Sequence, residues 1–165
     1  ANLPRASIAF ITERCTAPVF IDPVSTVKAE KLRGLLGRVH TLKPNRIEAE
    51  LLSGVTITDD ESLRQAAQAL LDQGVQRVFL SLGGDGVLAA QQDEMQRVPI
   101  CRAEMRNATG AGDAMMAALV WSFLSGRSLT ESAASGTAAA AIAVESEETI
   151  NPAMSAEAVE KRLAH

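Results

Sequence analysis

Residues 75–86, VQRVFLSLGGDG, carry the strongest strand signal of the chain. The apolar run VFL within this segment has no polar interruption, as in strands that a sheet buries on both faces. Gly83, Gly84 and Gly86 follow directly after it. A glycine turn at the end of a strand either closes an ordinary hairpin or lets a nucleotide phosphate approach the backbone. The segment therefore predicts a buried strand that ends in such a turn.

Helical and strand-like segments alternate around this strand. Helical apolar spacing is found in residues 4–15, 25–37, 45–54 and 58–74. Strand-like runs occupy residues 17–23 and 38–44, and a hairpin is expected over residues 86–100. Three further helices are expected over residues 111–125, 128–144 and 155–164. This alternation predicts an α/β fold with a largely parallel sheet and helices packed on its faces.

Capping residues mark several of the expected helix boundaries. Asn45 is expected to cap one helix, and Thr58 with Glu61 to form the capping box of the next. Gly37 is the expected end of the helix that begins at residue 25. These signals predict where the helices start and stop.

The composition predicts one compact domain. The chain has 165 residues, 47% of them hydrophobic and 22% charged, and a net charge of -4. Its acidic balance and its lack of a basic cluster argue against a nucleic-acid partner. No apolar run is long enough to cross a bilayer, and no signal-peptide pattern is present, so we expect a cytoplasmic protein without a membrane partner. Cys15 and Cys101 lack the spacing of a zinc or redox site.

The segment TGAGD, residues 109–113, combines a glycine turn with an acid at the expected start of a helix. Gly110 and Gly112 leave backbone N–H groups uncovered, and the helix N-terminus adds positive potential, so an anion is favoured there. Asp113 is then placed to accept a proton from a hydroxyl that attacks a phosphoryl group. In isolation, the same acid only complements the helix dipole.

Two further stretches have both a structural and a functional interpretation. Asn45 and Glu48 are either a plain capping box or a pair that holds a hydrated Mg²⁺ near phosphates. The spacing Gly84-x-Gly86-x-x-Ala89 after a strand loosely imitates a dinucleotide-binding fingerprint, which would indicate an oxidoreductase fragment. A Walker-type phosphate loop is excluded, because its motif does not occur in the sequence.

Taken together, the motifs NATGAGDAMMAAL, KPNRIEAELL and SLGGDGV resemble those of the ribokinase-like, or phosphofructokinase B, family of carbohydrate and nucleoside kinases. The resemblance implies a three-layer α/β/α fold and ATP-dependent phosphoryl transfer to a hydroxyl group of a sugar or nucleoside. It implies that Asp113 is the catalytic base and that the amides of Gly110, Ala111 and Gly112 form the anion hole.

The same resemblance assigns the nucleotide and metal contacts. It implies that Asn45 and Glu48 organise Mg²⁺ and the phosphates of ATP, Asn45 through an indirect contact. Ser81, Gly83 and Gly86 are implied to contact the nucleotide.

The resemblance also bears on the adenine pocket and on a monovalent cation. The pocket is expected along residues 134–144, with Gly136, Thr137 and Ala140 as contacts. Asn107 stands where most of the family has an aspartate that is tied to a K⁺ site.

Within the family, the combination PVFIDPVS, HTLKPNRIEAELLSG, NATGAGDAMMA and INPAMS is most similar to pseudouridine kinases. This similarity implies that the 5'-hydroxyl of pseudouridine is phosphorylated. Kinases of the ribokinase, adenosine kinase and ketodeoxygluconate kinase types are the alternatives within the family.

Family members are about twice as long as this chain. Residues 1–165 are therefore expected to be the C-terminal, nucleotide-binding and catalytic part of a kinase domain. The N-terminal part, with the substrate site and the lid that often dimerises, is expected to be absent. A non-catalytic nucleotide-binding module is the alternative for the chain on its own.

Overall fold

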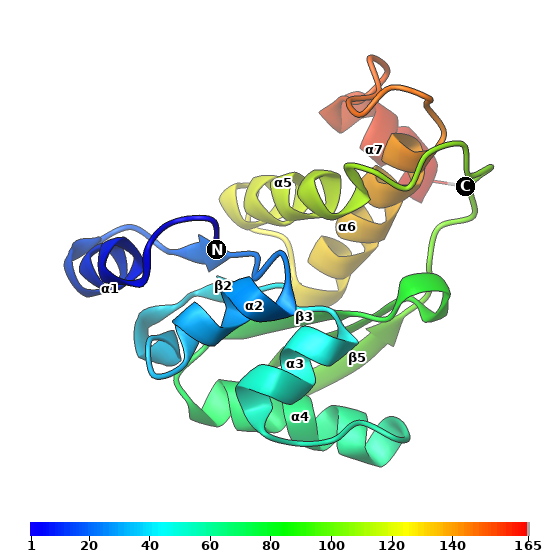
Figure 1. Cartoon of the computed structure of the whole chain (residues 1–165). Helices are drawn as coiled ribbons and strands as arrows, with labels where there is room; N and C mark the ends of the chain where they lie inside the picture. Colours follow the sequence, from blue (N-terminus) through cyan, green and yellow to red (C-terminus); the bar gives the residue numbers. More distant parts are fainter. Residues whose placement is uncertain (165) are drawn as a thin grey trace. The chain divides into compact units, whose positions relative to one another are not determined.

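The computed structural model describes residues 1–164 (Figure 1). The chain divides into two compact units. The first contains Ala1–Gly83 and Leu88–Gln96, and the second contains Gly84–Val87 and the chain from Arg97 onward. Each unit is described by itself below.

A five-stranded sheet has the order β1-β2-β3-β4-β5. Its strands are β1 (Phe20–Ile21), β2 (Thr41–Leu42), β3 (Arg77–Ser81), β4 (Val87–Gln91) and β5 (Glu94–Val98). The first three run parallel, with Phe20 opposite Thr41 and Thr41 opposite Arg77. A two-residue loop joins β4 to β5, which makes this pair the expected antiparallel hairpin. The sheet is therefore mixed, with its parallel part at the β1 side.

The first unit also contains helices. They are α1 (Arg5–Arg14), α2 (Thr26–Ala29), α3 (Arg46–Ser53) and α4 (Asp60–Asp72). Helices α3 and α4 lie side by side and pack against β3 (Figure 1). Leu52 of α3 and Leu63 and Leu70 of α4 are buried in one core with Val78 and Leu80 of β3. Burial of these apolar faces stabilises the helices more than their intrinsic propensity does.

The single helix expected over residues 25–37 is not observed, and this prediction was wrong. Helix α2 ends after one turn, and the chain continues through two 3-10 turns, Glu30–Leu32 and Leu36–Arg38. Gly34 between them has φ +73, a left-handed conformation that breaks the helix. The change of direction lets both Leu32 and Leu36 enter the core, at 0% and 2% exposure. Burial of two leucines thus outweighs continued helical hydrogen bonding.

The capping box of α4 lies one residue later than the sequence predicts. Asp59 caps the helix, and its Oδ1 accepts from the backbone N–H of Ser62 at 2.8 Å. Ser62 Oγ in turn accepts from the N–H of Asp59 at 3.0 Å, whereas Thr58 lies outside the helix. Aspartate is at least as good an N-cap as threonine, so Thr58 and Asp59 are both possible caps in the sequence. The backbone conformation at the helix start determines which of the two caps α4.

The second unit is helical beyond the hairpin. It contains α5 (Ala111–Leu124), α6 (Leu129–Val144) and α7 (Ala156–Leu163), as the sequence predicts. Helices α5 and α6 pack closely, because Gly136 of α6 faces Met115 of α5: a Cβ at Gly136 would lie 3.0 Å from Met115 Cγ. The Arg162 guanidinium ties α7 to Glu145, with Nη1 3.0 Å from Oε1.

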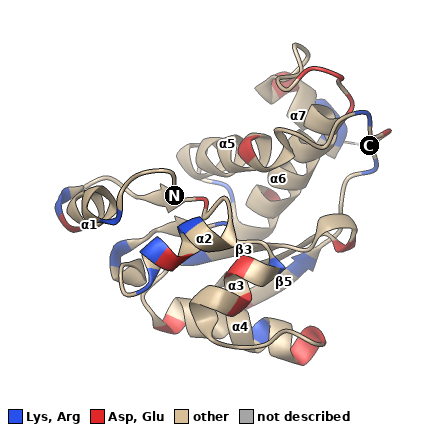
Figure 2. Cartoon of the chain, viewed as in Figure 1, with Lys and Arg blue, Asp and Glu red and all other residues tan. Residues whose placement is uncertain are grey.

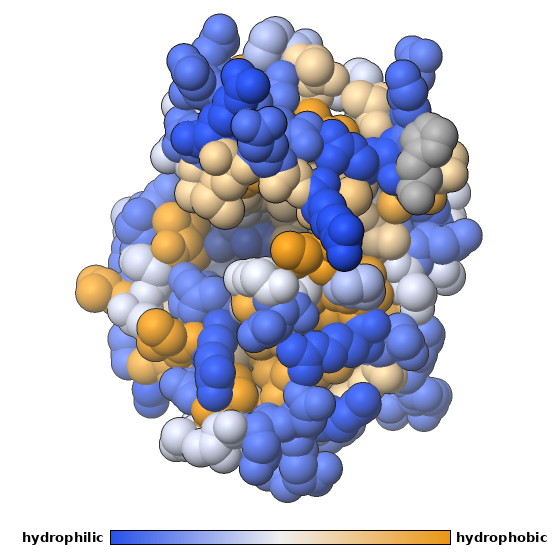
Figure 3. Space-filling model, turned by 90° about the vertical axis from the view of Figure 1, so that its right-hand side faces the viewer, coloured by the Kyte–Doolittle hydropathy of each residue, from blue (hydrophilic) through white to orange (hydrophobic). Residues whose placement is uncertain are grey.

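The surface carries charges of both signs. Both basic and acidic residues occur on the helices of the first unit (Figure 2). On the face drawn in Figure 3, hydrophilic side chains predominate over hydrophobic ones. Within residues 1–164, none of the helices has both the length and the apolar character that crossing a membrane requires.

Candidate active site

The carboxyl ends of β1, β2 and β3 form one edge of the sheet in the first unit. Asp22 follows β1, Lys43 follows β2, and Ser81 ends β3. Backbone hydrogen bonds hold these ends together: Lys43 N–H donates to Ile21 O at 3.0 Å, and Ser81 N–H donates to Pro44 O at 2.9 Å. Open α/β sheets bind ligands at this edge. This edge is therefore the candidate ligand site of the first unit.

A buried ion pair lies at this edge. Lys43 Nζ is 2.8 Å from Asp22 Oδ2, and the side chains are 7% and 21% exposed. Such a pair is costly to desolvate, so removal of one partner is expected to destabilise the protein. Asp22 was missed by the sequence analysis. The sequence provided little indication of its role, because Asp22 is a single acid after a short strand, in the run FIDP.

Asn45 and Glu48 form the capping box of α3. Asn45 Oδ1 accepts from Glu48 N–H at 2.9 Å, and Glu48 Oε2 accepts from Asn45 N–H at 2.9 Å. Asn45 also bridges to Ser81 on the neighbouring strand end. The structural interpretation of this pair is thus confirmed, and it leaves Oε1 of Glu48 outside the capping box. The Mg²⁺ role of the pair stays a prediction.

The environment of Glu48 perturbs its carboxyl group. The residue is 2% exposed. Desolvation raises the pKa of Glu48, and the nearby Asp22 carboxylate acts in the same direction. The Asn45 N–H and the Lys43 ammonium oppose this shift. A cation bound beside Glu48 would favour the ionised form of its carboxyl group.

The glycine turn after β3 uses its glycines for two different reasons. Gly83 has φ +59, and a Cβ there would meet nothing within 4 Å, so its backbone is open to a ligand. Gly86 has φ +89, and a Cβ there would lie 2.2 Å from Val98 O. Gly86 therefore allows the close approach of β5, which is a packing requirement of the hairpin.

The dinucleotide fingerprint of the sequence is not realised. A dinucleotide-binding turn must be followed by a helix whose N-terminus faces the pyrophosphate. Here Gly86 leads directly into β4, and Ala89 is a fully buried residue of that strand. The oxidoreductase alternative is therefore rejected.

The second unit has a candidate site of its own at the N-terminus of α5. Gly110 occupies the N-cap position with φ +88, and no side chain of the described residues caps this helix end. A Cβ at Gly110 would lie 2.5 Å from Thr149 O, so only glycine fits. The first-turn N–H groups, including those of Ala111 and Gly112, are available to an anion. Asp113 lies in this first turn and is exposed.

Asn107 stabilises the turn before α5. Its Oδ1 accepts from Thr109 N–H at 2.9 Å, and its Nδ2 donates to Glu147 O at 3.1 Å. Both ends of the amide are thus used within the protein. The expected K⁺ contact of Asn107 stays a prediction.

The expected adenine contacts lie on α6. Gly136 is buried against Met115, and Thr137 Oγ1 donates to the Ala134 carbonyl at 2.9 Å. Ala140 is half-buried. Close helix packing explains the small size of Gly136, and the nucleotide contacts of these three residues stay a prediction.

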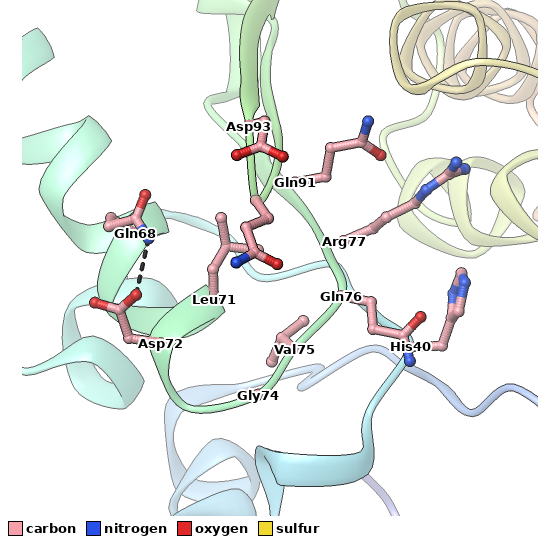
Figure 4. Close-up of a pocket in the computed structure, with 11 residues that line it drawn as sticks. His40, Gln68, Leu71, Asp72, Gly74, Val75, Gln76, Arg77, Gln91 and Asp93 are labelled. Carbon is pink, nitrogen blue, oxygen red and sulfur yellow. Dashed lines mark hydrogen bonds between the residues drawn. The ribbon is translucent and has the colours of Figure 1, made fainter.

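The first unit also has a polar hollow at the opposite end of the strands, with a volume of about 800 Å³ (Figure 4). His40 and Arg77 line it beside the loop that joins β4 to β5, and Gln68 donates to Asp72 Oδ1 at 2.8 Å across one wall. None of the expected site residues lines this hollow. It lies away from the edge where α/β sheets bind ligands, so the candidate active site is elsewhere.

Comparison with known proteins agrees with this arrangement. The pfkB family of carbohydrate kinases matches residues 5–156, and the chain belongs to this family. Pseudouridine kinase of Escherichia coli is 38% identical over 157 residues, which cover 93% of this chain and 50% of that protein.

Solved structures show the same fold. Ribokinase of Thermotoga maritima aligns with a TM-score of 0.85 at 28% identity, over 99% of this chain and 54% of that one. Ribokinase of Arabidopsis thaliana, solved with ribose and ATP, aligns with a TM-score of 0.83 at 25% identity, over 98% and 53%. The fold is therefore ribokinase-like, as the sequence predicts. The chain spans about half the length of these relatives.

Proposed function

We propose that the chain is the nucleotide-binding and catalytic part of an ATP-dependent sugar or nucleoside kinase. The observation that carries the proposal is the N-terminus of α5, where no side chain within residues 1–164 caps the helix and Asp113 is exposed in the first turn. An N-terminus of this kind favours an anion, and a carboxylate beside it can act on the hydroxyl that attacks the anion. Membership of the pfkB family supports the same reaction.

In this proposal the acceptor hydroxyl attacks the γ-phosphorus of ATP. A new P–O bond forms, the bond to the β,γ-bridging oxygen breaks, and ADP leaves. Asp113 takes the proton of the hydroxyl, and the amides of Gly110, Ala111 and Gly112 stabilise negative charge on the transferring group. Asn45 and Glu48 would hold Mg²⁺, which supplies positive charge at the phosphates. Ser81 and Gly83 lie at the same strand ends and would contact the nucleotide.

Pseudouridine is the substrate that we infer, with its 5'-hydroxyl as the acceptor. The identity of 38% to pseudouridine kinase over 93% of this chain supports the inference. A substrate panel with pseudouridine, ribose and adenosine tests it in the kinase domain that contains this chain. A higher kcat/KM for ribose or adenosine would instead assign the enzyme to another branch of the family.

The Asp113→Asn variant tests the reaction mechanism. We expect its kcat to fall by a factor of about 10²–10⁴, because the amide cannot accept the proton. Glu157→Gln is the matched control, since Glu157 is an exposed acid in the first turn of α7. A kcat for Asp113→Asn within about tenfold of the control would show that Asp113 is not the base.

A nucleotide-binding module without catalysis is the second candidate. The chain spans only 50% of pseudouridine kinase of Escherichia coli, and this favours the second candidate. Part of a kinase can bind the nucleotide and still lack the site for the acceptor. Titration calorimetry of the 165-residue chain with Mg-ATP separates the two. Binding without turnover supports the module, and absence of binding argues against both candidates.

A further inference from the structure

The turn after β1 contains a strained residue, Val24. Its φ is +72, in the left-handed region, and among the described residues 1–164 it is the only residue other than glycine with a positive φ. A β-branched side chain crowds the backbone in this conformation, so the turn costs free energy that glycine or asparagine would largely avoid. Residues held in such conformations are concentrated at functional sites.

Packing of the Val24 side chain does not offset this strain. The residue is 49% exposed, so about half of its surface lies outside any core. Pro23 before it is buried, and Ser25 after it caps α2 by accepting from Lys28 N–H at 3.4 Å. The buried proline and the helix cap therefore anchor the turn on both sides of a side chain that is itself left exposed.

Asp22 fixes the turn beside the candidate ligand site of the first unit. Its Oδ1 accepts from Val24 N–H at 2.9 Å, and its Oδ2 lies 2.8 Å from Lys43 Nζ. One carboxylate thus holds both the backbone of Val24 and the ammonium group that follows β2. The exposed side chain of Val24 is therefore held at the carboxyl edge of the sheet, where open α/β sheets bind ligands.

The order of the strands indicates which ligand approaches Val24. Ser81 and Gly83, the expected nucleotide contacts, lie at the end of β3. Asn45 and Glu48, the expected Mg²⁺ and phosphate residues, follow β2, which lies between β1 and β3. In phosphoryl transfer the attacking and leaving oxygens lie roughly in line, on opposite sides of the phosphorus. With ADP on the β3 side, the acceptor lies on the β1 side, where Val24 is.

We propose that Val24 is a specificity residue for the acceptor, and that its side chain packs against the C–H surface of the sugar beside the hydroxyl that is phosphorylated. The inference rests on the proposed function, from which it takes the positions of nucleotide and phosphates. Phosphates are bound by charged and hydrogen-bonding groups, which valine does not have. Valine is stiff at χ1, so the turn presents both methyl groups in a preorganised position.

Calorimetry tests the contact in the kinase domain that contains this chain. Pseudouridine, ribose and adenosine are titrated in turn without ATP, and the compound that binds most tightly is the probe. Val24→Asn removes the apolar surface but accepts the left-handed backbone. We expect its Kd for the probe to rise about tenfold, because two buried methyl contacts are lost, and its urea midpoint not to fall. In steady-state assays, KM for the acceptor is expected to rise while KM for Mg-ATP is unchanged.

Two further variants make the test specific. Val24→Ile keeps a branched apolar side chain and is expected to bind the probe within about threefold of the unmodified domain. Val27→Asn is the matched control, since Val27 is 77% exposed on α2, where valine and asparagine have similar helix propensities. The control is expected to change neither the Kd nor the urea midpoint.

Several outcomes would overturn the proposal. One is that none of the three compounds binds, and another is that Val24→Asn raises the Kd no more than Val27→Asn does. A rise in KM for Mg-ATP alone would assign Val24 to the nucleotide, and a lower urea midpoint with an unchanged Kd would assign it to packing.

Failure of this proposal and failure of the catalytic proposal are distinguishable, because the titrations contain no ATP and do not depend on turnover. If Asp113→Asn keeps its kcat while Val24→Asn weakens binding of the probe, the assignment of the base is refuted and the acceptor contact stands.

Discussion

The ammonium group of Lys43 lies 2.8 Å from the carboxylate of Asp22 and joins the carboxyl ends of β1 and β2. The two residues are neighbours in space because their strands are parallel and in register. Glu48 lies close enough for both charges to act on the pKa of its carboxyl group: Asp22 raises it and Lys43 lowers it. One cation and two acids therefore share the edge at which we place the phosphates and Mg²⁺.

Lys43→Met is expected to destabilise the chain by about 3 kcal/mol, because it leaves the Asp22 carboxylate without its partner in a largely buried position. Urea unfolding measures the difference. Arg33→Met is the matched control: Arg33 pairs with Glu30 at 2.9 Å, but the side chains are 56% and 51% exposed. The control is expected to cost about 0.5 kcal/mol or less. Equal losses in the two variants would show that burial of the Lys43 pair has no energetic consequence.

Glu48→Gln is expected to become more stable relative to the unmodified chain as pH rises. Burial raises the pKa of Glu48 above its ordinary value of 4.5. The stability that follows from the raised pKa is fully present below that ordinary value and is lost as pH rises through the folded pKa. Glutamine keeps the capping box and has no charge to desolvate. Urea unfolding at pH ~4 and ~7 measures the change.

Glu131→Gln provides the control of opposite sign. Glu131 occupies the same capping-box position on α6, where hydrogen bonds from Ser128 lower the pKa of its carboxyl group. The stability that follows from the lowered pKa of Glu131 is present above its unfolded pKa and is lost as pH falls through the folded pKa. The Glu131→Gln variant is therefore expected to become less stable relative to the unmodified chain as pH rises. The same pH trend in both variants would contradict the assignment for Glu48.

Gly83→Ala and Gly86→Ala are expected to separate ligand binding from packing. At Gly83 the only cost is the left-handed backbone, about 1 kcal/mol, and a methyl group on the open surface is expected to weaken Mg-ATP binding. At Gly86 the Cβ would also lie 2.2 Å from Val98 O, and the loss is expected to reach about 3 kcal/mol or more. Thermal unfolding and calorimetry measure the two effects. A Gly86→Ala chain as stable as Gly83→Ala would contradict the packing role.

Arg162→Met is expected to loosen α7 without a change in nucleotide affinity. Arg162 bonds both carboxylate oxygens of Glu145 and also the Arg102 carbonyl, at 3.0 Å. Loss of these partly buried contacts is expected to cost about 1–2 kcal/mol. Lys161→Met, at the exposed neighbouring position, is the control and is expected to be almost neutral. Faster hydrogen exchange confined to α7 in the Arg162 variant would support the prediction, and equal exchange in both would contradict it.

Local sequence signals predicted most of the elements. The cap at Asn45, the strand before the glycine turn and the hairpin after it are all observed. So are the three helices from Ala111 onward. These features depend on periodicity, capping and turn chemistry, which act over a few residues. The helix expected over residues 25–37 failed because a distant core, not local propensity, decided the path of Leu32 and Leu36.

The candidate site residues also divide into those that local sequence indicates and those that only distant contacts reveal. The sequence by itself determined the family motifs, the glycine turn and the acid in the first turn of α5, because these are contiguous in the chain. Only the tertiary structure decided that Asp22 pairs with Lys43 and that Glu48 is buried beside them. Those contacts join segments separated along the chain. Their energies arise from burial and charge that exist only once the strands are side by side.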